Sequence, residues 1–257
     1  MRSSTRVKLV ADIHGGVDPF SERTLEGIFE NLELKLDLHG WGGHRDVFER
    51  VFAEAPATGF HVEVGTWKGR SAAVQGEILW ERAQDVADAG ALLCVDTWLG
   101  APEFWIDKAD VNRFRSLGLI GGWPHVYYQF MFNVTCAGLE DIIVPFPQTS
   151  QNAAEVMRRM NWGRAASTIY IDASHEEAEV AADLAAWWPI LVDGGVMFGD
   201  DYCQRWNGVM SAVDRFAAQR GLRVEHLRRE NEQGRPPSDY WILRSDGVNV
   251  ASIDPTS

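Results

Sequence analysis

The sequence lacks several features that would each define a class of protein. No apolar run approaches the ~20 residues that a membrane span needs, and no apolar stretch follows the charged first residues, so neither a span nor a secretory signal is expected. Only 3 cysteines occur, too few and too widely spaced for a disulfide framework or a zinc site. Positive charge is scarce: 24 Lys+Arg against 37 Asp+Glu give a net charge of −13, which argues against nucleic-acid or anionic-membrane partners. A reduced, cytoplasmic protein is expected.

The composition is that of an ordinary globular protein. The chain has 257 residues, of which 46% are hydrophobic and 24% charged. This length suits one large α/β domain with at most a small appendage. We expect an N-terminal arm and cap helix in residues 1–45 and the main domain in residues 46–257.

Strand-like and helical patterns alternate along the chain after residue 59. The predicted strands cover residues 60–64, 91–95, 141–145, 168–171, 195–198, 223–227 and 240–243. The predicted helices cover residues 21–39, 46–55, 70–89, 126–137, 152–160, 176–188 and 209–220, while residues 1–20 show no periodicity and are expected to form a loose arm. This alternation predicts a Rossmann-like, doubly wound, mainly parallel seven-stranded sheet, and the last two strands predict an antiparallel edge hairpin.

One connection is much longer than a crossover needs, with roughly forty residues between the second and third predicted strands. Residues 99–125 within it are rich in Gly and Trp, which is typical of a lid or binding loop. A surface loop that leads into the crossover helix 126–137 explains part of the same pattern. Tryptophans in and near this connection are candidates either for stacking on a sugar or for packing the lid: Trp67, Trp98, Trp105 and Trp123.

Residues just after the strands are the first candidates for a site, because open α/β sheets bind ligands outside the carboxyl ends of their strands. Gly65 and Gly69 follow the first strand and allow the backbone to approach a ligand at a helix N-terminus. Their spacing departs from the G-x-G-x-x-G nicotinamide fingerprint. Asp96 follows the second strand, where it can accept hydrogen bonds from ribose hydroxyls or simply cap a turn. Ser150, after the third strand, is either a helix N-cap or part of an adenine-binding edge.

Acidic residues and a histidine follow the fourth and fifth strands. Asp172 and His175 come after one strand, and Asp200 and Asp201 come after the other. Three carboxylates cannot lie together ionised without a cation, and oxygen donors of this kind suit Mg²⁺. The alternative is purely structural: Ser174 to Glu177 match a capping box, and Asp201 can cap a turn.

These residues, taken in order, resemble a known family. The segments Glu63-Val64-Gly65-Thr66, Asp96-Thr97, Asp172-Ala173-Ser174-His175 and Gly199-Asp200-Asp201 look like those of class I S-adenosylmethionine-dependent methyltransferases. More specifically, the sequence is similar to the macrocin and mycinamicin sugar O-methyltransferases over roughly residues 59–245. It implies a metal at Asp172, Asp200 and Asp201, with His175 as the base and Asp172 beside it in catalysis. The cosubstrate-binding residues expected are Glu63, Gly65, Thr66, Gly69, Ser71, Asp96, Thr97, Thr149, Ser150 and Asp172.

The resemblance implies O-methylation of a hydroxyl on a small molecule or sugar, with S-adenosylmethionine as cosubstrate and Mg²⁺ or a similar cation as helper. No nucleic-acid or membrane partner is expected, and a homo-oligomer is left open. Two alternatives from other classes remain. One is an NAD(P)-dependent oxidoreductase, which the missing fingerprint disfavours, and the other is a non-catalytic S-adenosylmethionine-binding protein.

Overall fold

The computed structural model describes residues 2–21, 24–40, 43–85, 87–109, 113–230 and 237–245. Its contacts divide the chain into two compact units. The first unit combines residues 1–45 with 65–149, and the second combines residues 46–64 with 150–257. No helix in the described part of the chain is both long enough and apolar enough to cross a membrane.

Seven strands form one sheet in the order β5-β2-β1-β6-β7-β9-β8. Their bounds are β1 (Phe60–Val64), β2 (Ala91–Asp96), β5 (Ile143–Pro147), β6 (Ala166–Ile171), β7 (Leu191–Gly199), β8 (Glu225–Arg229) and β9 (Ser238–Arg244). β2 pairs with β5, and β1 and β7 pair with β6, all in parallel. β9 runs antiparallel to both β7 and β8. The predicted Rossmann-like sheet with an antiparallel edge hairpin is confirmed.

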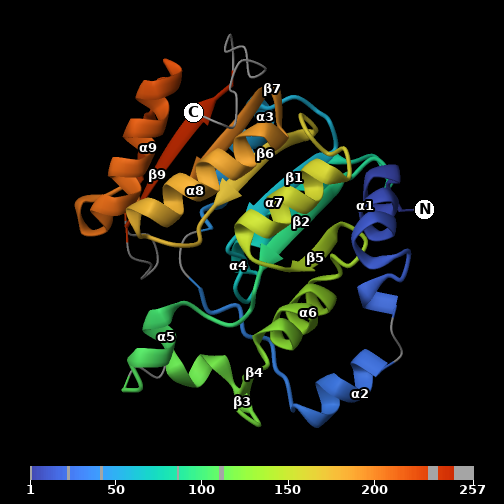
Figure 1. The fold of residues 1–257 in the computed structure, drawn as a ribbon. Helices are drawn as coiled ribbons and strands as arrows, with labels where there is room; N and C mark the ends of the chain where they lie inside the picture. Colours follow the sequence, from blue (N-terminus) through green and yellow to red (C-terminus); the bar gives the residue numbers. More distant parts are fainter. Residues whose placement is uncertain are drawn as a thin grey trace. The chain divides into compact units, whose positions relative to one another are not determined.

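Nine α-helices lie within the described residues. They are α1 (Ser4–His14), α2 (Thr24–Asn31), α3 (Arg45–Glu54), α4 (Arg70–Arg82), α5 (Pro102–Ile106), α6 (Val126–Ala137), α7 (Ser150–Arg159), α8 (Glu177–Trp187) and α9 (Asn207–Arg220). Figure 1 shows α8 and α9 side by side in the second unit. Most predicted helices lie within a few residues of these bounds, and α6 matches its prediction at both ends.

The N-terminal segment corrects one expectation, because residues 4–14 form α1 and not a loose arm. Ser3 caps the helix by accepting a hydrogen bond from the backbone N–H of Arg6, and Gly15 ends it in the left-handed conformation. Leu9 is fully buried, and the buried Arg6 pairs with Asp18 at 2.7 Å. The apolar pattern was too weak to reveal the helix, since a paired arginine fills part of its buried side.

Two predicted helices were too long. α2 ends at Asn31 instead of residue 39, and Glu33 just after it has a positive φ of 51°, which a helix cannot accommodate. Side-chain amides of α6 then hold the next segment: Gln129 Nε2 donates to Lys35 O at 2.9 Å, and Asn133 Nδ2 donates to Asp37 O at 2.7 Å. α4 likewise ends at Arg82, well before residue 89.

The core of the second unit explains why its strands read as apolar runs. Every residue of β1 and β6 is buried, as expected for parallel strands covered on both faces. The aromatic rings of Phe48, Tyr170 and Phe198 pack edge-on or tilted with centroids 4.9–5.5 Å apart. The buried His61 ring lies 2.8 Å from the Thr168 hydroxyl, so these polar groups are satisfied inside the core.

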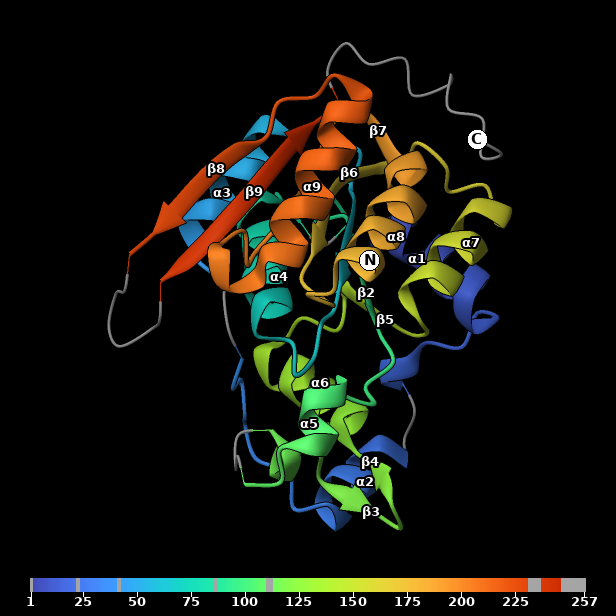
Figure 2. The ribbon, with the colours of Figure 1, turned by 60° about the vertical axis from the view of Figure 1, so that its left-hand side comes forward.

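The edge hairpin β8–β9 lies beside α3, as Figure 2 shows. Three ion pairs join them: Arg50 contacts Glu225 at 2.7 Å, Arg244 contacts Glu54, and Arg229 contacts Asp46. These partly exposed pairs add little stability each, but they orient the hairpin against the helix.

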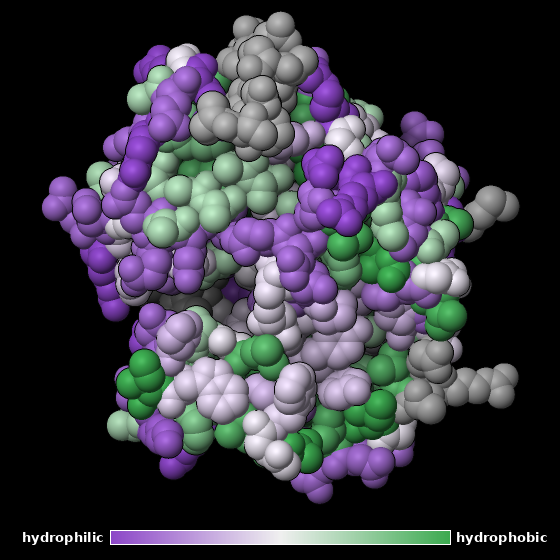
Figure 3. Space-filling view, viewed as in Figure 1, coloured by the Kyte–Doolittle hydropathy of each residue, from purple (hydrophilic) through white to green (hydrophobic). Residues whose placement is uncertain are grey.

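The long connection of the first unit holds short elements in place of a featureless loop. It contains α5, a 3₁₀ turn (Phe114–Leu117) and a two-stranded hairpin of β3 (Leu119–Ile120) and β4 (Trp123–Pro124). Apolar residues gather low on the face drawn in Figure 3, where Figure 1 places α2, α5 and this hairpin. Ile106, Ile120 and Trp123 are all more than half exposed. Whether residues 99–125 move as a lid remains a prediction.

Candidate active site

The glycine loop after β1 has the backbone conformation that its residues require. Gly65 and Gly69 have φ angles of 88° and 84°, and Trp67 between them has 51°. A Cβ on Gly69 would lie 2.8 Å from Cδ2 of Phe130, so no other residue fits there without displacing that ring. Gly69 donates to Thr66 O at 2.9 Å, which closes the turn before α4 begins. The loop therefore has the sharply turned backbone that its glycines predict, while close approach to a ligand stays a prediction.

Asp96 at the end of β2 holds this loop in place. Its Oδ2 accepts from the backbone N–H of Trp67 at 2.7 Å, and its Oδ1 accepts from the N–H of Trp98 at 2.7 Å. Burial raises the pKa of Asp96, and these backbone hydrogen bonds act in the opposite direction. The turn-capping interpretation thus holds, and Asp96 is half-buried, so the residue remains partly accessible to a ligand. The Asp96–Trp67 link joins residues far apart in sequence and was not predicted.

Four further predicted residues lie in the first unit. Thr66 is buried, and its hydroxyl has no hydrogen-bond partner within the described residues. Ser71 is buried in the first turn of α4. Thr97 is exposed after Asp96, and its hydroxyl accepts from the N–H of Leu99 at 3.2 Å. Thr149 is exposed, and its N–H donates to the side chain of Gln148.

The tryptophans near this loop serve mostly as packing. Trp98 is 2% exposed, packs against Tyr127 and Phe130, and donates from Nε1 to Trp67 O at 2.7 Å. Trp67 packs on Phe104 with ring centroids 4.5 Å apart. Trp105 donates from Nε1 to Leu99 O, whereas Trp123 is 69% exposed. Of the four, Trp123 is the most available to a ligand.

Two further predicted residues lie in the second unit. Glu63 is fully buried in β1. Ser150 is the first residue of α7, and its hydroxyl accepts a hydrogen bond from Trp187 Nε1 at 2.9 Å. That contact anchors the start of α7 on α8. A role for either residue in cosubstrate binding stays a prediction.

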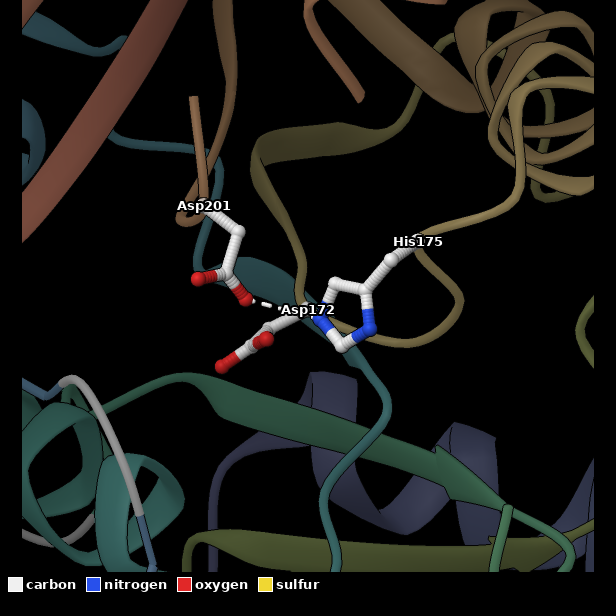
Figure 4. Close-up of side chains that lie close together, drawn as sticks. All are labelled: Asp172, His175 and Asp201. Atoms are coloured by element: carbon white, nitrogen blue, oxygen red, sulfur yellow. Dashed lines mark hydrogen bonds and ion pairs between the residues drawn. The ribbon is translucent and has the colours of Figure 1, made fainter. Parts of the chain in front are cut away.

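A cluster of acidic residues and a histidine forms at the carboxyl ends of β6 and β7. The two strands are parallel and in register, with Ile171 opposite Gly199, so Asp172 and Asp200 leave the sheet at the same edge. His175 Nε2 lies 2.7 Å from Asp201 Oδ2, and donor atoms of Asp172, His175 and Asp201 all lie within 4.8 Å of one another (Figure 4). Asp172, His175 and Asp201 therefore lie close together, as the order of strands along the sequence predicts.

Asp200, which was predicted as a metal ligand, forms hydrogen bonds within the protein. Its Oδ1 accepts from the backbone N–H of Asp201 at 2.8 Å, and its carboxylate also hydrogen-bonds Ser238. Within the described residues, the compact donor set is Asp172, Asp201 and His175; Asp200 is not part of it, although it lines the same cavity. Asp201 itself has a φ of 63°, which turns its side chain back toward His175.

The carboxylates of the cluster oppose one another electrostatically. Burial, with the charge of Asp201, raises the pKa of Asp172 to about 7, although His175 and the Tyr170 hydroxyl at 3.1 Å act against the rise. Burial and both neighbouring aspartates raise the pKa of Asp200 well above its usual value. A group of this kind is stabilised by a proton or by a cation.

The donor set fits a small hard cation on this observation. The adjoining cavity measures about 10 Å³ and is lined by Asp172, Ser174, His175, Asp200 and Asp201, among others. That volume accommodates about one water-sized species. Two carboxylates and an imidazole are ligands that Mg²⁺ and Mn²⁺ accept, while the imidazole also suits zinc.

The neighbourhood of His175 fixes the plane of its ring. Trp206 stacks on the imidazole with centroids 4.1 Å apart and an interplanar angle of 18°. Gly208 allows α9 to approach, since a Cβ there would lie 2.3 Å from the carbonyl oxygen of His175. The capping-box alternative is wrong: α8 begins at Glu177, and Ser174 accepts from the N–H of Glu176 at 3.2 Å without capping the helix. Trp206 was missed because nothing in its sequence surroundings marks it.

Comparison with known proteins identifies the family. A family model described as a methyltransferase domain matches residues 62–202. Because this match spans more than half of the chain, the protein belongs to that family of methyltransferase domains. Among curated proteins, none matches the chain significantly.

Solved structures share the fold at low sequence identity. An O-methyltransferase from Bacillus cereus, in complex with SAH, has a TM-score of 0.54 and 15% identity over 93% of this chain and 96% of that one. The O-methyltransferase TomG from Streptomyces achromogenes, involved in tomaymycin synthesis and solved with SAM, has a TM-score of 0.56 and 10% identity over 96% of this chain and 100% of that one. The calicheamicin methyltransferase CalS11 has a TM-score of 0.52 and 18% identity over 78% of this chain and 76% of that one. At these identities the similarity shows the fold.

Proposed function

We propose that the protein is an S-adenosylmethionine-dependent O-methyltransferase that acts on a hydroxyl of a small molecule or sugar and is assisted by a divalent cation. The observation that carries the proposal is the Asp172–His175–Asp201 cluster at the strand ends of a methyltransferase domain. A methyltransferase of hydroxyls needs a proton acceptor, and His175 supplies one.

The glycine loop and Asp96 support cosubstrate binding. The open backbone at Gly65 and Gly69 suits close approach by a nucleoside-amino acid ligand, and the helix N-terminus of α4 follows directly. Asp96 is half-buried at the end of β2, and its carboxylate is the acceptor proposed for the ribose hydroxyls. The buried, unpartnered hydroxyl of Thr66 is a further polar group of this loop.

The reaction transfers the methyl group from sulfur to oxygen in an in-line displacement. The acceptor oxygen attacks the methyl carbon, the C–S bond breaks as the C–O bond forms, and the hydroxyl proton goes to the imidazole of His175. The Asp201 carboxylate, 2.7 Å from Nε2, stabilises the imidazolium that results. Trp206 keeps the ring in one plane, so the basic nitrogen is already oriented before the acceptor binds.

Asp172 and Asp201 are the residues that would hold a divalent cation, with Asp200 supporting Asp201 through its backbone bond. A cation bound there would lower the pKa of a neighbouring hydroxyl and orient vicinal oxygens. The raised pKa of Asp172 supports this assignment, because burial and the charge of Asp201 both disfavour the ionised carboxylate, and a bound cation would favour it.

Calorimetry with S-adenosylhomocysteine, followed by a methyl-transfer assay on sugars and phenols with Mg²⁺ or with EDTA, tests the proposal. Binding and metal-stimulated transfer to oxygen are expected. Binding without transfer to any hydroxylated acceptor would instead indicate a non-catalytic binding protein. Binding of NAD(P) in place of S-adenosylhomocysteine would indicate an oxidoreductase.

A further inference from the structure

A second cavity, distinct from the acidic cluster, lies within the first unit. It measures about 230 Å³, which is room for a functional group or a small ring and not for a whole drug-sized ligand. Its lining comes from the segment after α2, the glycine loop, the long connection and α6: Asp37, Lys68, Arg115, Ser116, Gly118, His125 and Gln129.

Lys68 is the most deeply placed charge of this cavity. It is 3% exposed, and its Nζ lies 2.6 Å from Asp37 Oδ2 and 5.7 Å from the centroid of the Trp67 ring. Its backbone oxygen accepts from Asn133 Nδ2 at 2.8 Å, which fixes the residue at the cavity wall. An ammonium has three donors and Asp37 uses one, so the buried lysine retains capacity for another acceptor.

Arg115 adds a second positive charge from the long connection. Within the described residues, its guanidinium forms no ion pair, although the chain carries 37 acidic residues. An arginine presents five N–H donors in a fork that matches carboxylate or phosphate oxygens. Because the Arg115 guanidinium has no ion pair within the described residues, it is available to bind an anionic ligand.

Neutral polar groups complete the lining. His125 Nδ1 is buried and has no hydrogen-bond partner among the residues described, and Ser116 offers a hydroxyl. Gly118 makes room for the histidine, because a Cβ there would overlap the imidazole ring at 2.1 Å. Burial lowers the pKa of His125, the charge of Lys68 acts in the same direction, and a hydrogen bond with the Gly118 backbone acts against them. Lys68 and Arg115 against Asp37 leave the cavity with a net charge of about +1 at neutral pH.

We propose that this cavity binds an anionic group, a phosphate or a carboxylate, carried by the methyl acceptor. The inference rests on the proposed function, and it narrows the acceptor class to hydroxylated molecules that bear such a group. Lys68 and Arg115 recognise the anion, and Ser116 and His125 supply additional polar contacts. The net charge of −13 over the whole chain opposes a polyanionic nucleic acid, while a single small anion needs only this local site.

Titration of the purified full chain with inorganic phosphate, at constant ionic strength and followed by calorimetry, tests binding directly. Phosphate should bind, and glucose 6-phosphate should bind at least as well. Glucose should bind at least about tenfold more weakly than glucose 6-phosphate. Arg115→Gln should weaken phosphate binding by about tenfold or more, since it removes a charge-assisted hydrogen-bond donor. Arg113→Gln, two positions away and outside the cavity lining, is the matched control and should leave the affinity unchanged. No phosphate binding, or equal losses in both variants, would overturn the proposal.

The amino acid carboxylate of the cosubstrate is the other source of an anion, and a second pair of probes separates it. If the site serves the acceptor, phosphate binds with the same affinity when S-adenosylhomocysteine is present, and Arg115→Gln leaves S-adenosylhomocysteine affinity unchanged. Competition between the two ligands would overturn the assignment to the acceptor. So would a loss of S-adenosylhomocysteine affinity in Arg115→Gln without a loss for methylthioadenosine, which lacks the carboxylate.

Lys68→Met tests the buried charge, with circular dichroism to confirm that the variant folds. If it fails to fold, Arg115→Gln alone decides the question, because Arg115 is exposed. These binding measurements need no turnover. An absent phosphate site beside intact methyl transfer therefore refutes the inference alone, whereas an intact phosphate site without S-adenosylhomocysteine binding refutes the proposed function.

Discussion

Asp96 Oδ2 accepts a hydrogen bond of 2.7 Å from the backbone N–H of Trp67, so the carboxylate that follows β2 holds the loop that follows β1. The same carboxylate binds the N–H of Trp98, which in turn donates from its indole to the carbonyl of Trp67. Asp96 is thus a positioning residue for the glycine loop as well as a candidate ribose ligand. The two roles make different demands on its oxygens.

Asp96→Ala should weaken S-adenosylhomocysteine binding by at least tenfold and lower the free energy of unfolding by about 1–3 kcal/mol, because two backbone donors lose their acceptor. Calorimetry and urea unfolding measure the two effects. Asp96→Asn keeps one acceptor oxygen and should recover part of both. An affinity equal to that of the wild type in Asp96→Ala would remove this residue from the binding site.

The contact between Gly69 and Phe130 gives a second prediction. Gly69→Ala forces a left-handed backbone on alanine and places its Cβ 2.8 Å from the Phe130 ring, so the free energy of unfolding should fall by about 2–4 kcal/mol. Gly138→Ala is the matched control. Gly138 also has a positive φ, of 67°, but a Cβ there meets nothing within 4 Å, so about 1 kcal/mol should be lost. Equal losses by urea unfolding would show that the ring contact has no effect.

The regular part of the fold was predictable because its strands are buried on both faces. β1 was predicted at its exact bounds, since an apolar run between turn residues leaves few alternatives. α1 was missed because a buried Arg6–Asp18 pair replaces part of the apolar face that periodicity detects. Only tertiary contact supplies that partner, so local sequence could not reveal the helix.

The site was predictable in its residues and less so in its geometry. Strand ends place Asp172 and Asp201 at one edge, which the alternation of strands and helices implies. The compact donor set contains His175 and lacks Asp200, whose Oδ1 accepts from the backbone N–H of Asp201. The Lys68–Asp37 pair was not predicted, because an ion pair across 31 positions depends on how an irregular segment passes the glycine loop.

The pKa of Asp172 predicts how stability depends on pH without a cation. A carboxyl whose pKa rises from 3.8 to about 7 on folding is favoured in its protonated form, so its effect on stability is absent below pH 4. As pH rises through that interval, the native state loses stability. In EDTA, Asp172→Asn should therefore raise the free energy of unfolding by on the order of 2–4 kcal/mol at pH 8 and change it little at pH 4.

Urea unfolding at the two pH values measures this difference. Asp193→Asn is the control, because Asp193 is exposed and pairs with Arg164 at the surface, where an ion pair contributes little. Equal effects of Asp172→Asn at both pH values would show that the ionised carboxylate is not strained by its surroundings.

The long connection should become more ordered when cosubstrate binds. Its elements are short, and Ile120 and Trp123 are largely exposed, so few buried contacts hold them in the free protein. Hydrogen exchange of residues 99–109 and 113–125 should slow by at least tenfold with S-adenosylhomocysteine, while α6 changes little. Slow and identical exchange in both states would contradict a lid.

The roles of His175 and Asp201 can be separated by measuring cation binding and turnover in the same variants. Asp172→Ala and Asp201→Ala should abolish binding of Mn²⁺, a probe for Mg²⁺, because each removes a carboxylate of the compact donor set. His175→Ala should retain S-adenosylhomocysteine and Mn²⁺ binding but slow turnover by roughly 10²–10⁴-fold, the range of a lost general base. His226→Ala is the matched control. The Nε2 of His226 lies 2.8 Å from Asp239 Oδ1 on the edge hairpin, so this substitution should leave turnover unchanged. If His175→Ala loses Mn²⁺ as completely as Asp201→Ala does, the imidazole is a ligand and another group must accept the proton.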